Sequence, residues 1–227
     1  MSIHVNERMA ASSVETAPVL PVAPLAPGTA DSCRNSRTKR FIDIVGSASG
    51  LVLLSPILAL LMGLIFLQDR GPVFFRQKRT GLDGEVFHIW KLRSMSVPPK
   101  PTPFRQTRGP HDPRITPLGR WLRATSLDEL PQLMNVLAGE MSLVGPRPHP
   151  VELDASYKPR FEAYMQRYSV RPGLTGNAQV SGARGPINSR EDMRNRLQHD
   201  LDYIRDWSVW LDVRLIFRTV LFPSKGH

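Results

Sequence analysis

The chain has 227 residues, enough for one medium-sized domain with a buried core. Its 30 lysines and arginines against 20 aspartates and glutamates give a formal net charge of +10, which favours anionic partners such as nucleic acid, anionic lipid or phosphorylated substrates. The single cysteine, Cys33, excludes an internal disulfide framework and suits a reducing compartment.

The first 38 residues are rich in Ala, Pro, Ser and Thr and show neither a helical nor a strand period. Such a segment has too little apolar surface to offset the entropy of ordering it. The composition therefore predicts a disordered N-terminal tail over residues 1–38.

An uncharged apolar run covers residues 44–67. Roughly 20 apolar residues suffice for a helix to cross a bilayer, so a membrane segment is predicted over residues 39–70. The apolar region of a cleaved signal peptide is shorter, about 7–15 residues, and therefore fits this run poorly.

Ser55 and Pro56 lie at the centre of this run. Proline removes a backbone donor and clashes with the preceding turn, so we expect the helix to kink or break there, with Ser55 covering a freed carbonyl. Basic residues flank both ends of the run and give no reason to move either end across the membrane. The pattern favours a re-entrant helix-break-helix that enters and leaves by the cytoplasmic leaflet, with a single span as the alternative. The flanking basic residues are Arg34, Arg37, Lys39, Arg40, Arg70, Arg76, Lys78 and Arg79.

Residues 71–227 are predicted to form the catalytic domain, mainly α-helical with a small β-hairpin. The hairpin joins β-prone runs at 73–75 and 85–90 through a Gly-containing turn at 81–84. The proline-rich stretch 97–111 is predicted to be a loop. The last segment, 208–222, follows directly after Trp207 and combines apolar residues with Trp210 and two arginines, which fits either an amphipathic helix in the lipid headgroup region or a core helix. Further helices are predicted at 118–124, 127–137, 157–168 and 190–205.

The adjacent acids Asp128 and Glu129 are the strongest candidates for chemistry. A structural explanation exists, because Ser126 and Glu129 match a capping box at the start of a helix. The neighbouring sequence favours a functional explanation, because arginines occur both before and after the acidic pair and suit phosphate binding. An aspartate in such a setting can attack phosphorus as a carboxylate nucleophile, and paired carboxylates suit Mg²⁺.

Two stiff Gly/Pro elements, at 145–148 and 171–176, each hold an arginine, Arg147 and Arg171. Restricted backbone suits the fixed presentation of a guanidinium, and a pair of ordinary turns is the alternative. No Walker loop, dinucleotide-binding glycine motif, zinc spacing or serine-hydrolase elbow occurs in the sequence.

An ordered series of short motifs over about residues 38–223 resembles the bacterial sugar transferase family, the monotopic phosphoglycosyl transferases. The motifs begin with Lys39-Arg40-Phe41-Ile42-Asp43, Ser55-Pro56 and Lys91-Leu92-Arg93-Ser94-Met95. They continue with Asp112-Pro113-Arg114-Ile115-Thr116, Leu127-Asp128-Glu129-Leu130-Pro131-Gln132, Gly145-Pro146-Arg147-Pro148 and Arg171-Pro172-Gly173-Leu174-Thr175-Gly176.

The resemblance implies an enzyme of the bacterial inner membrane, with its catalytic domain on the cytoplasmic face. Asp128 would attack the β-phosphate of a UDP-sugar, release UMP and hold the sugar phosphate covalently until a polyprenyl phosphate accepts it. Glu129 would assist with Mg²⁺ or proton handling, and both acids are candidate metal ligands. The residues implied in binding substrate or phosphate are Arg93, Arg114, Arg147, Arg171 and Gln179.

The run from Gly176 to Gly185 looks most like the branch that initiates exopolysaccharide or capsule synthesis with glucose-1-phosphate on undecaprenyl phosphate. Galactose and acetamido sugars remain alternatives, and a homodimer is left open. Longer family members carry extra N-terminal membrane helices and a soluble domain, whereas this sequence has only the tail.

Two other classes of function compete with the enzyme. A non-catalytic basic scaffold at the membrane, within a polysaccharide assembly complex, would form its complex without turnover. A peripheral module for nucleic acid or anionic lipid would leave the acids without a role, and the apolar run argues against nucleic acid as the partner.

Overall fold

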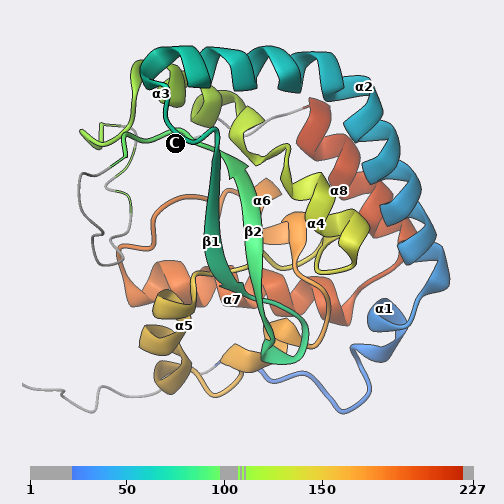
Figure 1. Ribbon diagram of the computed structural model, residues 1–227. Coiled ribbons are helices and arrows are strands. Elements are labelled where there is room, and N and C mark those ends of the chain that lie inside the picture. The colour runs from blue at the N-terminus through green and yellow to red at the C-terminus, as the bar shows by residue number, and fades with distance from the viewer. Residues whose placement is uncertain (1–21, 98–106, 108, 110, 222–227) are drawn as a thin grey trace, which may run out of the picture.

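The computed structural model describes residues 22–97, 107, 109 and 111–221 and shows a mainly helical chain with a two-stranded hairpin, as predicted (Figure 1). The strands are β1 (Phe74–Thr80), β2 (Val86–Leu92), β3 (Ser142–Val144) and β4 (Gly173–Thr175). The α-helices are α1 (Asp31–Arg34), α2 (Arg37–Asp69), α3 (Pro117–Thr125), α4 (Gln132–Ala138), α5 (Val151–Tyr157), α6 (Asn177–Val180), α7 (Arg190–Arg205) and α8 (Val209–Leu221). Short 3₁₀ turns are η2 (Leu82–Gly84), η3 (Leu127–Glu129), η4 (Lys158–Arg160) and η5 (Tyr164–Tyr168).

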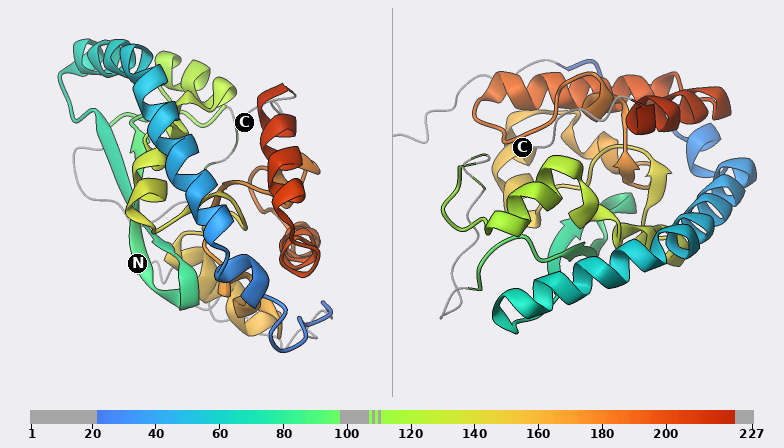
Figure 2. Two further views of the ribbon diagram at one scale, coloured as in Figure 1. Left: turned by 90° about the vertical axis from the view of Figure 1, so that its right-hand side faces the viewer. Right: turned by 90° about the horizontal axis from the view of Figure 1, so that it is seen from above.

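Helix α2 covers the predicted membrane segment 39–70 up to Asp69 and is long and apolar enough to cross a membrane. It continues through Pro56 instead of breaking there, but its two halves point in different directions (Figures 1 and 2). The Ser55 hydroxyl donates to the carbonyl of Val52 at 2.8 Å, which is the carbonyl that a proline at position 56 leaves without its helical donor. The prediction of a kink with a serine covering the freed carbonyl is confirmed, whereas a complete break is wrong.

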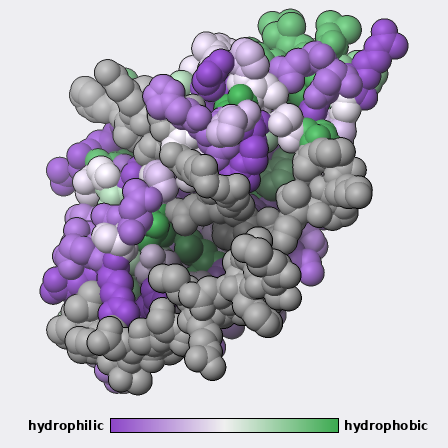
Figure 3. All heavy atoms as spheres, turned by 90° about the vertical axis from the view of Figure 1, so that its left-hand side faces the viewer, coloured by the Kyte–Doolittle hydropathy of each residue, from purple (hydrophilic) through white to green (hydrophobic). Residues whose placement is uncertain are grey.

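Both ends of α2 are fixed to the same domain. Near its start, buried Lys39 donates to the Val144 carbonyl at 2.8 Å and pairs with Asp212 of α8 at 2.7 Å. At its end, Asp69 forms a two-point ion pair with Arg93, just after β2. Between these anchors most of the helix faces outward, and many of its large apolar side chains are exposed. In Figure 3 the largest group of hydrophobic residues lies at the upper edge, where the second half of α2 is found.

The hairpin β1–β2 turns one face inward because its side chains alternate. Phe87 and Ile89 on this face join a buried cluster with Val136 of α4 and Met141. Lys91 follows them at the same spacing, so its side chain also points into the domain. The hairpin is confirmed, with strands longer than the predicted runs.

Strands β3 and β4 form a short parallel pair that the sequence did not predict. This strand pair brings the two Gly/Pro elements together. Their backbones can come into contact because the glycines at the contact have no Cβ. A Cβ on Gly173 would lie 2.1 Å from the Gly145 nitrogen, and one on Gly176 would lie 2.2 Å from the Gly145 carbonyl oxygen. The two elements are therefore one packed unit rather than separate turns.

The largest apolar cluster lies around η5 and α7 and includes Phe161, Tyr164 and Leu201. The predicted helix at 190–205 is confirmed as α7, which begins with a capping box between Ser189 and Asp192. The predicted helix at 157–168 is wrong: only the turns η4 and η5 form there, and the helix of this region, α5, ends at Tyr157.

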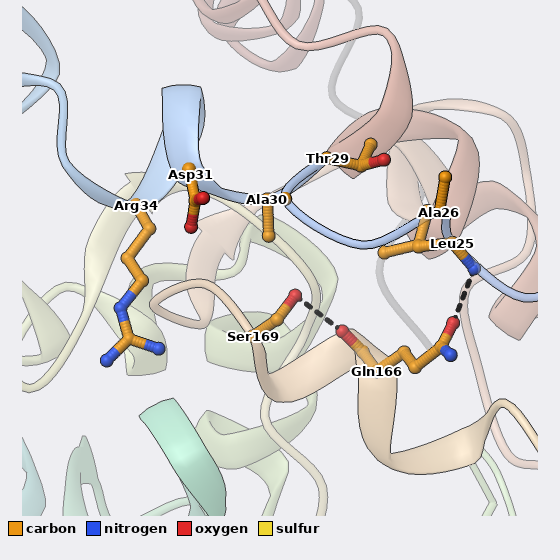
Figure 4. A pocket seen from close by; sticks show the side chains of 9 residues that line it. Leu25, Ala26, Thr29, Ala30, Asp31, Arg34, Gln166 and Ser169 are labelled. Carbon is orange, nitrogen blue, oxygen red and sulfur yellow. Dashed lines mark hydrogen bonds between the residues drawn. The ribbon is translucent and has the colours of Figure 1, made fainter.

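Residues 22–38, which were assigned to the disordered tail, are ordered against the domain. They contain α1 and the start of α2, and both Val22 and Cys33 are buried in the main cluster. The Leu25 amide donates to the Gln166 side chain at 2.6 Å beside a shallow cleft of about 280 Å³ (Figure 4). The rest of the predicted tail, residues 1–21, lies outside the described residues, as does most of the predicted loop at 97–111.

Candidate active site

Asp128 and Glu129 lie in η3, a single turn between α3 and α4. Ser126 before them adopts a left-handed backbone with φ 60° and ends α3. Its hydroxyl accepts a hydrogen bond from Arg184 at 2.7 Å and caps no backbone amide of η3. The capping-box explanation of this motif is therefore wrong, and both carboxylates are directed elsewhere.

Glu129 is held by two cations. Its Oε1 accepts from Lys91 Nζ at 2.6 Å, and Arg147 grips both carboxylate oxygens, with Nη1 3.1 Å from Oε2. Burial alone would raise the pKa of Glu129, but Arg147 and Lys91 outweigh it and hold the pKa well below its ordinary value. Glu129 is thus an ionised carboxylate near neutral pH, held by two cations.

Asp128 is also buried, with 6% of its surface exposed, yet within the described part of the chain its carboxylate makes no hydrogen bond or ion pair. Burial raises its pKa to about 6, and neighbouring Glu129 adds to the rise, while Lys91 and two arginines oppose it. A buried carboxylate without a hydrogen-bond partner is energetically costly, and such groups are frequent at functional sites, so Asp128 is the better candidate of the two for a reactive group.

More positive than negative charge surrounds the two acids. Arg123 near the end of α3 lies close enough to stabilise the Asp128 charge. Arg79 and Arg184 interact electrostatically with Glu129, and burial lowers the pKa of both. Together with Lys91 and Arg147 they form a cationic setting for two carboxylates, which suits a substrate with several negative charges.

The structure brings only one of the predicted phosphate-binding arginines onto the acidic pair, and that is Arg147. Arg93 is buried and taken up by Asp69 at the end of α2. Arg114 pairs with Asp112 at 2.7 Å within its own motif. The Arg93 pair links the end of α2 to the segment after β2, whereas the Arg114 pair is local to its own motif.

Arg171 and Gln179 also make their hydrogen bonds away from the acidic pair. Arg171 Nε donates to the Gly139 carbonyl at 3.0 Å, at the opposite end of α4 from η3. Gln179 Nε2 donates to the Leu174 carbonyl at 3.2 Å, while its buried Oε1 has no partner among the described residues.

Three cations of the site, Lys91, Arg79 and Arg184, were not predicted as functional from the sequence. For Lys91 and Arg79 a signal existed, because they stand on the same hairpin face as the apolar Phe87 and Ile89. For Arg184 no local pattern distinguishes it from a surface arginine.

The acidic pair fits a magnesium ion only in part. Mg²⁺ in phosphate-transfer sites is held by one or two carboxylates together with substrate phosphates. Asp128 has the unengaged oxygens this requires, whereas Glu129 already accepts from two cations. Among the described residues no group of three acidic, histidine or cysteine side chains is placed to hold a metal.

Comparison with known proteins identifies relatives over most of the chain. It is 47% identical over 186 residues to the UDP-glucose:undecaprenyl-phosphate glucose-1-phosphate transferase of Escherichia coli (strain K12), covering 82% of this chain and 40% of that protein. It is 49% identical over 183 residues to the protein of the same name from Caulobacter vibrioides, covering 80% of this chain and 68% of that protein. A UDP-N-acetylgalactosamine-undecaprenyl-phosphate N-acetylgalactosaminephosphotransferase of Aeromonas hydrophila is 39% identical, covering 80% of this chain and 42% of that protein.

The chain thus spans about two fifths of the length of the Escherichia coli relative. The family described as "Bacterial sugar transferase" matches residues 34–225, which include η3 and every cation placed around it. The chain belongs to the bacterial sugar transferase family.

Proposed function

We propose that this protein transfers a sugar-1-phosphate from a UDP-sugar to undecaprenyl phosphate, with glucose as the sugar, and so initiates an exopolysaccharide or capsule. The observation that carries the proposal is the unpartnered, buried carboxylate of Asp128 beside a Glu129 that two cations hold. The relatives support the substrate class through their names, and those at 47% and 49% identity are named for glucose.

In the first step an Asp128 oxygen attacks the β-phosphorus of the donor. A bond forms between the carboxylate and phosphorus, the bond from phosphorus to the bridging oxygen breaks, and UMP leaves with that oxygen. In the second step an oxygen of undecaprenyl phosphate attacks the same phosphorus, and Asp128 leaves as a carboxylate. The product is an undecaprenyl-diphosphate sugar.

The cations around the pair have distinct tasks in this scheme. Arg147 and Lys91 hold Glu129 and lie within electrostatic reach of Asp128. They stabilise the negative charge that develops on the phosphoryl oxygens and on the leaving UMP. Arg123 and Arg184 extend this positive field toward the rest of the diphosphate.

Mg²⁺ belongs to the proposal as the cofactor. Asp128 is the residue that would hold it, and the ion would supply positive charge that screens the donor phosphates and polarises the phosphorus. Glu129 would remain the charge that orients Arg147 and Lys91.

The geometry of α2 supports a re-entrant membrane segment and a cytoplasmic active site. A straight helix that crossed the bilayer would separate its ends by roughly 30 Å of hydrocarbon. Here Lys39 near one end and Asp69 at the other both bind the same domain, and the helix bends between them (Figure 1). Both ends would then lie on the cytoplasmic side, where nucleotide sugars are made.

The decisive experiment uses the full chain in lipid nanodiscs with UDP-glucose, Mg²⁺ and undecaprenyl phosphate. Wild-type protein should release UMP, and mass spectrometry after incubation with the donor alone should find a hexose-phosphate adduct on the peptide that contains Asp128. Asp128→Asn should show neither. Glu129→Gln serves as the matched control: it should turn over slowly but still form the adduct. UMP release at the wild-type rate by Asp128→Asn would reject the nucleophile.

Competition among donors tests the sugar separately. UDP-glucose, UDP-galactose and UDP-N-acetylgalactosamine would be compared by their kcat/KM for UMP release. A preference for either of the last two would leave the chemistry intact but overturn the choice of glucose.

A further inference from the structure

The segment that presents Arg147 is held at nearly every backbone carbonyl. Arg147 lies in the loop after β3, defined here as the arginine loop, residues 145–149. Donors from five separate parts of the chain reach its carbonyls and that of the residue before it. These are Lys39 Nζ and Tyr203 OH on Val144, Gly173 N on Pro146, Arg167 Nη2 on Arg147, Arg79 Nη1 on Pro148 and Thr80 N on His149.

Arg167 is a deeply buried member of this set, with 1% of its surface exposed. Its Nη2 lies 2.8 Å from the Arg147 carbonyl oxygen and 2.6 Å from Asp200 Oδ2, and its Nε lies 3.1 Å from the same carboxylate oxygen. Asp200 is itself buried, so each of the two supplies the charge that the other needs. A guanidinium held in this way cannot turn without breaking an ion pair inside the protein.

The remaining nitrogen of Arg167 is bound as well. Nη1 donates to His149 Nδ1 and to the Tyr168 hydroxyl at 3.2 Å. Burial, reinforced by Arg167, keeps the pKa of His149 well below its ordinary value, so the ring is neutral and accepts through Nδ1. Arg167 therefore binds both ends of the Arg147–His149 stretch.

We infer that Arg167, oriented by Asp200, is a positioning residue for the transfer reaction: it fixes the backbone of Arg147 so that the Arg147 guanidinium meets Glu129 and the donor phosphates. The inference rests on the proposed function. Its physical basis is geometric, because the Arg147 side chain starts from a backbone whose carbonyl Arg167 holds. A displacement of about 1 Å in a group that orients a reactive centre lowers rates by up to roughly a hundredfold.

The role is tested by a double-mutant cycle on kcat/KM for UMP release in the full-length protein. Arg167→Lys retains the charge opposite Asp200 but loses the forked geometry that reaches two acceptors at once. We expect it to lower kcat/KM by about tenfold or more in the wild-type background. In the Arg147→Ala background it should have less than about a twofold effect, because the side chain that it positions is gone.

Arg40→Lys is the matched control. Arg40 also donates to two carbonyls, those of Val136 and Leu137, but at the far end of α4 from the acidic pair. Its effect on kcat/KM should be the same in both backgrounds, and thermal melting of all variants shows how much of each effect is lost stability.

Every outcome of the cycle decides the question. An Arg167→Lys effect that is equal in both backgrounds, or that is absent in the wild-type background, overturns the positioning role. If Arg167→Lys does not fold, Asp200→Asn takes its place in the same cycle, since it weakens the hold on Arg167 without removing the arginine. A wild-type protein that releases no UMP would instead reject the proposed function.

Discussion

The raised pKa of Asp128 predicts how the first step depends on pH. A carboxylate attacks phosphorus only when it is ionised, so activity should fall as the pH drops through about 6. At pH 5 roughly a tenth of the Asp128 population would be ionised and at pH 7 roughly nine tenths, which predicts about a tenfold fall in rate. With the ordinary value of 3.8 the rate would change by less than about a tenth over the same range.

Replacing Lys91 changes this profile in a defined direction. Lys91 is the strongest of the charges that lower the Asp128 pKa, so Lys91→Met should raise the pKa further. The acid limb should move to higher pH by about one unit, the lower end of the effect of a nearby opposite charge. Lys78→Met is the control, because Lys78 lies on the same hairpin but is exposed.

Single-turnover release of UMP from pH 4.5 to pH 8 isolates the step in which Asp128 reacts. Differences between variants in the plateau at high pH report other effects of the substitution, so the midpoint is the quantity compared. A wild-type rate that stays flat from pH 7 to pH 5, or a Lys91→Met midpoint equal to that of wild type, would refute the reasoning.

Three further outcomes are expected. Chelation of divalent cations should stop UMP release and added Mg²⁺ should restore it, whereas release that persists in chelator would remove the metal from the proposal. Gly173→Ala should cost at least about 1–3 kcal/mol of stability, measured by chemical denaturation, because its Cβ would meet the backbone of the arginine loop. Gly63→Ala is the control and should be tolerated, because a Cβ at Gly63 would meet open space. An equal loss of stability in both variants would contradict the close backbone contact between Gly173 and Gly145. For the membrane topology, single cysteines would replace exposed Asn35 and Gln68 in a variant that lacks Cys33. Both cysteines should react with an impermeant maleimide only after the cells are permeabilised. Labelling of either one in intact cells would argue against the re-entrant arrangement of α2.

Periodicity and proline chemistry predicted the elements that depend on local sequence. The helices at 117–125 and 190–205, the hairpin and the kink at Pro56 all form as expected, since caps, turns and alternation are local signals. The parallel pair β3–β4 was missed because strands of three residues are too short to show a sequence pattern. Each strand forms only by pairing with the other, and the paired residues Ser142 and Gly173 are 31 positions apart in the sequence.

The acidic pair could be found from the sequence, but its partners could be found only in part. Arg93, Arg114 and Arg147 are the same residue type in similar Pro- or Ser-containing motifs. What separates them is the carboxylate that each meets in space: Asp69, Asp112 and Glu129, respectively. Of these three carboxylates only Glu129 lies in η3, and the sequence spacing between Arg147 and Glu129 does not reveal that they meet.

The buried side of α2 has a consequence for how the protein is made. The buried polar residues of its first half are Lys39, Asp43 and Ser47. Asp43 binds Ser142 and Leu143, and Lys39 binds Asp212. These partners lie 99 to 173 residues further along the chain and are therefore synthesised much later. A nascent α2 that sank into lipid at once would leave these polar groups unsatisfied in hydrocarbon. On the proposed topology, the first half of α2 would therefore enter lipid only when the domain is complete, and a chain released before α8 would keep this apolar helix at the membrane–water interface.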